Sequence, residues 1–188
     1  MKNTLKDVFF SKGKITIRHF RNGKELRVWQ EYRILHFLRK LYGWNIPKIF
    51  GLTGYFRFGA TYANLVPTAG KGLISGRISG VGSPAAPSYM AIGTGTTAAA
   101  AGDTALETEI TDGGGARGSA TVTLVTTTVT NDTVQSVKSW TFTLAKNVSE
   151  MGLLNDATTG TLEVRNVFTA YPMQIGDTLE ITHKLKNA

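Results

Sequence analysis

Cysteine is absent from this sequence of 188 residues. Its absence excludes a disulfide framework, a thiolate metal site and a cysteine nucleophile. Long apolar runs are also missing, since no stretch approaches the roughly 18 apolar residues of a membrane-spanning helix, and we do not expect a membrane to be the partner. A chain of this length can bury a core without a metal or a disulfide, so we expect one domain with an appended arm.

Acidic residues are scarce in the first third of the chain. Residues 1–60 hold thirteen Lys and Arg against three Asp and Glu, a net charge of +10, whereas residues 61–188 carry a net charge of −2. This asymmetry indicates either a solvated structural segment or a basic arm that meets an acidic partner. The partner of such an arm could be a protein face, nucleic acid or an anionic membrane surface.

The basic segment contains a predicted β-hairpin. Two alternating runs in "KITIRHFRNGKELRVW" flank Asn22 and Gly23, a pair that readily takes the positive φ angles of a type I′ turn. Because side chains alternate along an extended backbone, we expect Ile15, Ile17 and His19 to share one face.

An amphipathic helix is predicted directly after the hairpin, in "EYRILHFLRKLYG", and Gly43 closes it. Its apolar side suits either a partner or membrane surface, or packing against the hairpin itself. Cationic and aromatic side chains of the whole arm could contact a protein partner, or nucleic acid through phosphate contacts and stacking. The candidate partner-binding residues are Arg18, Arg21, Lys24, Arg27, Arg33, Phe37, Arg39 and Lys40.

Residues 61–87 are predicted to connect the arm to the rest of the chain. In "TAGKGLISGRISG", Leu73, Ile74 and Ile78 have helical spacing, although three glycines within the run, Gly70, Gly72 and Gly76, weaken the helical pattern. The following "VGSPAAPS" has the composition of a loop.

From Ser88 onward the pattern becomes that of an antiparallel β-sandwich. Apolar residues alternate with threonines in several runs separated by turn signals, which is typical of sheets with one buried and one exposed face. Threonine on the exposed face adds no charge, so these sheets would suit packing against other proteins. The residues expected to face the core are Ala120, Val122, Leu124, Trp140, Phe142, Leu144, Leu179, Ile181, His183 and Leu185.

The segment "GTGTT" at residues 93–97 resembles a phosphate-binding loop only in its glycines. A P-loop needs a Lys followed by Ser or Thr, and a dinucleotide fingerprint needs a helix within a βαβ unit. Alanines and an acidic stretch follow Gly95 instead. We therefore interpret this loop as a connector between strands.

No catalytic constellation is evident. The three histidines, His19, His36 and His183, stand next to neither a nucleophile elbow nor a metal-ligand spacing. Acidic residues in Gly-rich loops, such as Asp103 and Asp156, are expected to cap local backbone amides rather than bind calcium. We expect no catalytic residue, no metal and no cofactor.

Several ordered segments resemble small β-rich structural proteins of tailed bacteriophages. They are "NLVPTAGKGLISGRI", "PSYMAIGTGTTAAAAGDTALETEI" and "VSEMGLLNDATTGTLEVRNVF", and together they span roughly residues 64–183. In that family a short helix precedes a strand of the form "IAIGTG", a Thr/Ala loop ends in "DTAL", and a "SE.GL.N..TGT" stretch leads to the last strands. The ending "LEITHKLKNA" departs from the aromatic-rich last strand of the family.

The resemblance implies a non-enzymatic virion protein, most simply a head-associated decoration, cement or connector component. It also implies homo-oligomers and contacts with other capsid or tail subunits. A tail or tail-fibre component that touches the host is the alternative within this class, and a nucleic-acid- or membrane-binding accessory module is the alternative outside it.

The expected fold is mainly β, an antiparallel β-sandwich of jelly-roll or Ig-like type with an N-terminal hairpin-plus-helix arm. Its expected parts are a basic arm (1–60), a connecting segment with a short helix (61–87) and the sandwich (88–188).

Overall fold

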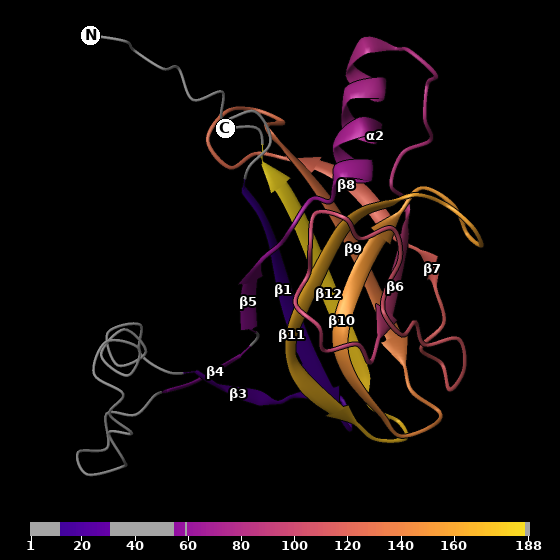
Figure 1. The fold of residues 1–188 in the computed structure, drawn as a ribbon. Helices are drawn as coiled ribbons and strands as arrows, with labels where there is room; N and C mark the ends of the chain where they lie inside the picture. The colour runs from indigo at the N-terminus through magenta and orange to yellow at the C-terminus, as the bar shows by residue number, and fades with distance from the viewer. Residues whose placement is uncertain (1–11, 31–54, 59, 187–188) are drawn as a thin grey trace, which may run out of the picture.

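The computed structural model of the chain describes residues 12–30, 55–58 and 60–186 (Figure 1). The prediction of a mainly β protein built from antiparallel sheets is confirmed. The predicted amphipathic helix after the hairpin lies outside the described residues.

The larger sheet has six strands in the order β2-β1-β12-β9-β8, with β5 also paired to β1. All pairings in this sheet are antiparallel. The strands are β1 (Lys12–Arg21), β2 (Lys24–Glu25), β5 (Ala60–Ala63), β8 (Thr121–Val125), β9 (Thr133–Thr141) and β12 (Thr178–Lys186).

The smaller sheet has four strands in the order β11-β10-β6-β7, and it faces the larger sheet across one hydrophobic core (Figure 1). Helix α2 (Thr68–Ser79) contacts β11, and β3 (Arg27–Gln30) pairs with β4 (Tyr55–Phe58) as a separate ribbon. The strands of the smaller sheet are β6 (Tyr89–Gly93), β7 (Gly118–Ser119), β10 (Lys146–Leu154) and β11 (Leu162–Met173).

The predicted hairpin turn is confirmed, and its first strand belongs to the larger sheet, but its returning strand is only β2, because Arg27–Gln30 pairs with β4 and does not continue along β1. Asn22 and Gly23 have φ angles of 50° and 72°, as a type I′ turn requires, and β2 folds back on β1 there. β1 also pairs with β12 from Lys12 opposite Lys186 to Phe20 opposite Thr178. Ile15 and Ile17 have no exposed surface and lie in the core, so this part of the basic segment is integral to the β structure.

The predicted alternation holds along β12 but is wrong at two other places. Val122 and Leu124 of β8 are 38% and 59% exposed, because β8 is the last strand of its sheet and the residues that the structure describes do not cover its inner side. Leu144 is 47% exposed because it lies in the loop after β9 rather than in a strand. Trp140 and Phe142 are buried as expected.

The helix predicted in the connecting segment is confirmed as α2, which packs on β11. Ile74 is buried, whereas Ile78 is 66% exposed. Gly70 allows the close approach, since a Cβ atom there would lie 2.2 Å from the carbonyl oxygen of Glu163. Arg77 of the helix pairs with the buried carboxylate of Glu163, whose pKa is raised by burial.

A matched pair of isoleucine substitutions tests whether β1 is part of the core. Ile17→Ala should lower the free energy of unfolding by about 2–5 kcal/mol, because it leaves a cavity between the sheets. Ile175→Ala, at a residue that is 73% exposed, should change it by less than about 0.5 kcal/mol. Denaturant unfolding of both variants provides the measurement. Equal, small effects would contradict the placement of β1 in the core.

Candidate functional site

Two of the candidate partner-binding arginines are held by ion pairs within the β structure. Arg18 donates to Glu25 from Nε at 2.9 Å and from Nη2 at 2.8 Å, and to Glu180 from Nη1 at 3.1 Å. The hydrogen bonds to Glu25 raise the pKa of Arg18. Its guanidinium also lies 4.8 Å from the ring centroid of Phe20. These contacts compensate the charge of Arg18, which the sequence assigned to an acidic partner.

Arg21 is engaged in a similar way, with a buried carboxylate. Asp177 is 1% exposed and accepts hydrogen bonds from Arg21 Nε at 2.8 Å, Arg21 Nη2 at 2.7 Å and the Gln174 amide at 2.8 Å. His19 Nε2 lies 2.8 Å from the same carboxylate. The Arg21 hydrogen bonds hold the pKa of Asp177 well below its usual range. This cluster fastens the turn between β11 and β12 to the hairpin.

Of the remaining candidate partner-binding residues, the structure describes the side chain of Lys24 alone. Lys24 is exposed in the hairpin. The side chain of Arg27 lies outside the described residues, and so do Arg33, Phe37, Arg39 and Lys40.

A second group of lysines gathers at one end of the outer face of the larger sheet. Lys14 of β1 stands directly opposite Lys184 of β12, and Lys186 donates to the Thr128 hydroxyl at 2.5 Å. We name Lys14, Lys184 and Lys186 the basic end. Within the described residues none of the three forms an ion pair, so their charge is available to an anionic partner. The sequence could not reveal this group because its members come from opposite ends of the chain.

The loop that begins with "GTGTT" folds back over the outer face of the smaller sheet. Its main anchor is Glu150 of β10, which has no exposed surface. Oε1 of this carboxylate accepts the amides of Gly95 at 3.1 Å and Thr108 at 2.8 Å, and Oε2 accepts the amide of Glu107 at 3.1 Å. The amide of Thr97 donates to the carboxylate of Glu107 at 2.8 Å.

These contacts explain why the loop is a connector. The backbone N–H groups of Gly95 and Thr97, which a phosphate loop would offer to a ligand, are already taken by carboxylates of the chain. The hydrogen bonds from Thr97 lower the pKa of Glu107. A Cβ atom at position 95 would lie 2.5 Å from Glu150 Oε1, so only glycine permits this approach.

Arg165 of β11 balances the buried negative charge. It donates to Glu150 Oε2 from Nε at 3.0 Å and from Nη2 at 2.9 Å, and to Asp103 from Nη1 at 2.8 Å. Burial opposes its charged form, but the hydrogen bonds to Asp103 and Glu150 outweigh burial and raise its pKa. Its backbone also exchanges two hydrogen bonds with Leu65. We name Gly95, Asp103, Glu107, Glu150 and Arg165 the loop-anchoring network.

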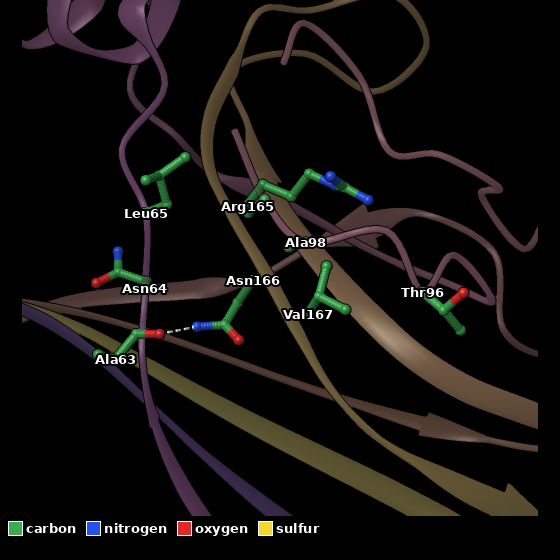
Figure 2. Close-up of a pocket in the computed structure, with 9 residues that line it drawn as sticks. Ala63, Asn64, Leu65, Thr96, Ala98, Arg165, Asn166 and Val167 are labelled. Atoms are coloured by element: carbon green, nitrogen blue, oxygen red, sulfur yellow. Dashed lines mark hydrogen bonds between the residues drawn. The ribbon is translucent and has the colours of Figure 1, made fainter. Parts of the chain in front are cut away.

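An open pocket of about 320 Å³ lies beside this network (Figure 2). It is lined by residues 63–65, residues 165–167 and the loop residues Thr96, Ala98 and Ala99. Figure 2 shows Asn166 reaching across to the carbonyl oxygen of Ala63, to which its amide donates. Asn64 Oδ1 is buried without a hydrogen-bond partner in the structure.

His183 lies in the core rather than in a cleft. It is 1% exposed, and its Nε2 atom accepts from Asn64 Nδ2 at 3.2 Å. Ser136 stands opposite it on β9, and both Ser136 Oγ and His183 Nδ1 are buried without a partner in the structure. Burial lowers the pKa of His183 to about 4.

Acidic residues in the loops act as the sequence predicted. Asp103 accepts the amide of Ala100 at 2.9 Å, and Asp156 accepts the amides of Thr158 and Thr159. Among the residues that the structure describes, no three His, Asp or Glu side chains gather as metal ligands, and no helix is long and apolar enough to cross a membrane.

No family model, curated protein or solved structure matches this chain. Its candidate sites therefore stand on their own geometry. Sequence reasoning missed Glu150 and Arg165, which lie in two strands with no recognisable site motif. The one available signal was that Glu150 interrupts an otherwise apolar or small stretch, "VSEMGLL".

The loop-anchoring network makes a prediction about stability. Glu150→Gln should lower the free energy of unfolding by about 3–5 kcal/mol, because the buried Arg165 charge loses the carboxylate that accepts two of its hydrogen bonds, and the new amide turns a donor toward backbone donors. Glu180→Gln, which breaks a partly exposed pair with Arg18, should cost about 1 kcal/mol or less.

Urea unfolding measures both variants, and hydrogen exchange at the Gly95, Glu107 and Thr108 amides locates the change. A Glu150→Gln protein as stable as Glu180→Gln would contradict the anchoring role.

The low pKa of His183 makes stability depend on pH. Between its ordinary value of 6.5 and about 4, the unfolded chain binds a proton at this residue and the folded protein does not. The free energy of unfolding should therefore fall as pH falls, with His183 contributing a loss of about 2 kcal/mol by pH 5.

The measurement compares the pH dependence of unfolding for the native protein and His183→Gln, which should lack this contribution. An NMR titration of the imidazole in the native protein is independent of the variant. A His183 resonance that titrates near 6.5 would refute the prediction.

Proposed function

We propose that this chain is a non-enzymatic structural protein of a tailed-bacteriophage virion, associated with the head as a decoration, cement or connector component. The observation that carries the proposal is the convergence of the segments that resemble this family. Gly95 and Asp103 come from the second segment, Glu150 and Arg165 from the third, and Leu65 from the first. All five meet at the loop-anchoring network.

This convergence supports the resemblance, because the segments that carry the resemblance are separate in the sequence but contact one another in the folded protein. The strand of the "MAIGTG" piece is β6, and the "SEMGLL" piece is β10, which pairs with it from Glu150 opposite Gly93 to Leu154 opposite Tyr89. The "DTAL" piece returns onto the sheet through Leu106, which packs with Ala91 and Leu154. A pattern whose parts form one folded unit is a stronger ground for a shared fold than isolated motifs. The jelly-roll or Ig-like type and the hairpin-plus-helix arm remain part of the proposal.

Surface chemistry favours assembly as the purpose of this fold. The exposed face of β8 and the loop up to Asn131 carries threonines and apolar side chains without charge, whereas the basic end presents clustered lysines. A neutral surface suits contacts between protein subunits, and the basic end suits an acidic neighbour. We assign the anchoring of the protein to a particle to the basic end together with the basic segment, including Lys24, Arg27, Arg33, Phe37, Arg39 and Lys40.

Immuno-gold labelling of intact particles tests the proposal. Gold on the heads of virions produced by the virus that encodes this chain is the expected result. Gold on tails or fibres would favour the host-contacting alternative, and particles free of the protein would reject a virion role altogether.

A charge-reversal variant tests the basic end as the anchor. Lys14→Glu/Lys184→Glu should reduce incorporation into particles by at least about tenfold, equivalent to about 1.4 kcal/mol, because two cations opposite an acidic neighbour become anions. Lys71→Glu, at an exposed lysine of α2, is the matched control and should be incorporated normally.

Quantitative immunoblotting of purified particles measures incorporation, after thermal unfolding has shown that both variants fold. Deletion of residues 1–60 would not serve, because it removes β1 and its core residues. Normal incorporation of the double variant would contradict the anchor.

Nucleic-acid binding is the second candidate function, because Lys14 and Lys184 place two like charges side by side on an exposed sheet face. Phosphate contacts of this kind weaken steeply as salt rises, through counterion release. Titration with duplex and single-stranded DNA at low and high salt decides it. Absence of binding at low salt removes this candidate.

A further inference from the structure

The strand β8 leaves one edge of the larger sheet open. Its five residues pair with β9 on one side, from Thr121 opposite Val137 to Val125 opposite Thr133. Within residues 60–186 no backbone hydrogen bond closes its other side. The other outer strands of the two sheets are shorter or have further bonds: β2 and β7 have two residues each, β5 has four and its Ala63 carbonyl accepts from Asn166, and β11 is bonded to Leu65.

Two apolar side chains of β8 are partly exposed at this edge of the sheet. Val122 stands opposite Ser136 and Leu124 opposite Val134, so both point to the inner side of the sheet. Ser136 is completely buried there, yet Val122 is 38% and Leu124 59% exposed. The inner surface of the larger sheet thus extends one strand beyond the cover that the smaller sheet provides.

This edge has none of the usual protections against strand pairing. Natural edge strands carry charges, especially Lys, or Pro or a bulge, which prevent pairing with another chain. Residues 118–131 contain no charged residue and no proline, and β8 pairs with β9 in unbroken register.

The loop that follows β8 is held rigidly next to the edge. The Asp132 carboxylate accepts the amides of Thr127, Thr128 and Val129 at 2.8, 2.8 and 3.1 Å, and these bonds, against the opposing effect of desolvation, lower its pKa. Val129 in this loop is 67% exposed. A preformed loop of this kind lowers the entropic cost of binding a partner.

We propose that β8 pairs edge to edge with β8 of a second copy of this chain, antiparallel about a two-fold axis through Thr123. This register places Val122 opposite Leu124 of the second copy, and Leu124 opposite its Val122, on the inner side of the joined sheet. Thr121 then stands opposite Val125 of the second copy. The exposed Val122 and Leu124 side chains of each molecule then cover those of the other.

Symmetry and charge select a second copy as the occupant. A strand related to itself by a two-fold axis perpendicular to the sheet is always antiparallel, and its open N–H and C=O groups are then complementary by construction. The chain carries a net charge of +8, so two copies repel each other where their basic residues come close. At the uncharged edge of β8, two copies can approach each other without this repulsion. This inference deepens the homo-oligomeric part of the proposed function.

Sedimentation analysis of the full chain over a range of concentrations tests the pairing. A dimer with a micromolar dissociation constant is expected, because a five-residue strand buries a small interface. Leu124→Lys should raise this constant by at least about tenfold, since a charge enters the apolar pairing. Leu144→Lys makes the same substitution at another exposed leucine and should leave the constant unchanged.

A cysteine substitution tests the register. Because the chain has no cysteine of its own, Thr123→Cys introduces a single thiol. Residues directly opposite on antiparallel strands have Cα atoms about 4.5–5.5 Å apart, which is within disulfide range. Mild oxidation should therefore yield a covalent dimer of Thr123→Cys. Thr158→Cys, at an exposed residue between β10 and β11, should form no covalent dimer under the same oxidation.

Three results would overturn the inference: a monomer at every concentration, equal weakening by Leu124→Lys and Leu144→Lys, or no covalent dimer of Thr123→Cys. The cysteine variant leaves the apolar residues of β8 intact, so it decides the matter even where Leu124→Lys fails to fold. All of these measurements use the isolated chain. Failure of the dimer is therefore distinguishable from failure of the virion role, which only particle labelling can show.

Discussion

A carboxylate sealed from water must find all of its hydrogen bonds inside the protein, and Glu150 finds them in three backbone amides and one arginine. These donors come from the loop after β6 and from β11, so the buried charge is satisfied only when both have reached their final positions. An uncompensated buried charge costs several kcal/mol, which makes partly assembled arrangements unfavourable. The outer side of the smaller sheet therefore forms as a unit around this residue.

The same network decides where the molecule can bind something else. Its amides are occupied, and the buried clusters at Asp177 and Glu163 likewise use their charges internally. Among the described residues, the groups that remain available include the backbone edge of β8 and the lysines of the basic end. Both are flat, exposed surfaces, which favour partners of protein size over small molecules, and this distribution agrees with the proposed role in assembly.

In the N-terminal segment, the excess of positive charge is a poor guide to whether the segment packs with the sheets. Its excess of Lys and Arg predicts an arm separate from the sandwich, yet Ile15 and Ile17 of the same segment face the core. Arg18 and Arg21 supply part of the excess, but Glu25, Glu180 and Asp177 neutralise them. Two of these acids lie near the other end of the chain. A count along the sequence cannot detect compensation between residues that meet only in the folded protein.

Local features were determined by the sequence itself. The Asn22-Gly23 turn, the alternation along β12, helix α2 and the caps at Asp103 and Asp156 all depend on residues close together in the chain, whose preferences for backbone angles and local hydrogen bonds act in any context. Only the tertiary structure decided that β1 pairs with β12, that Glu150 meets Arg165 across two strands, and that β8 is left as an edge. Those outcomes depend on which distant strands become neighbours, because burial and charge compensation are properties of the assembled sheets and not of any single stretch.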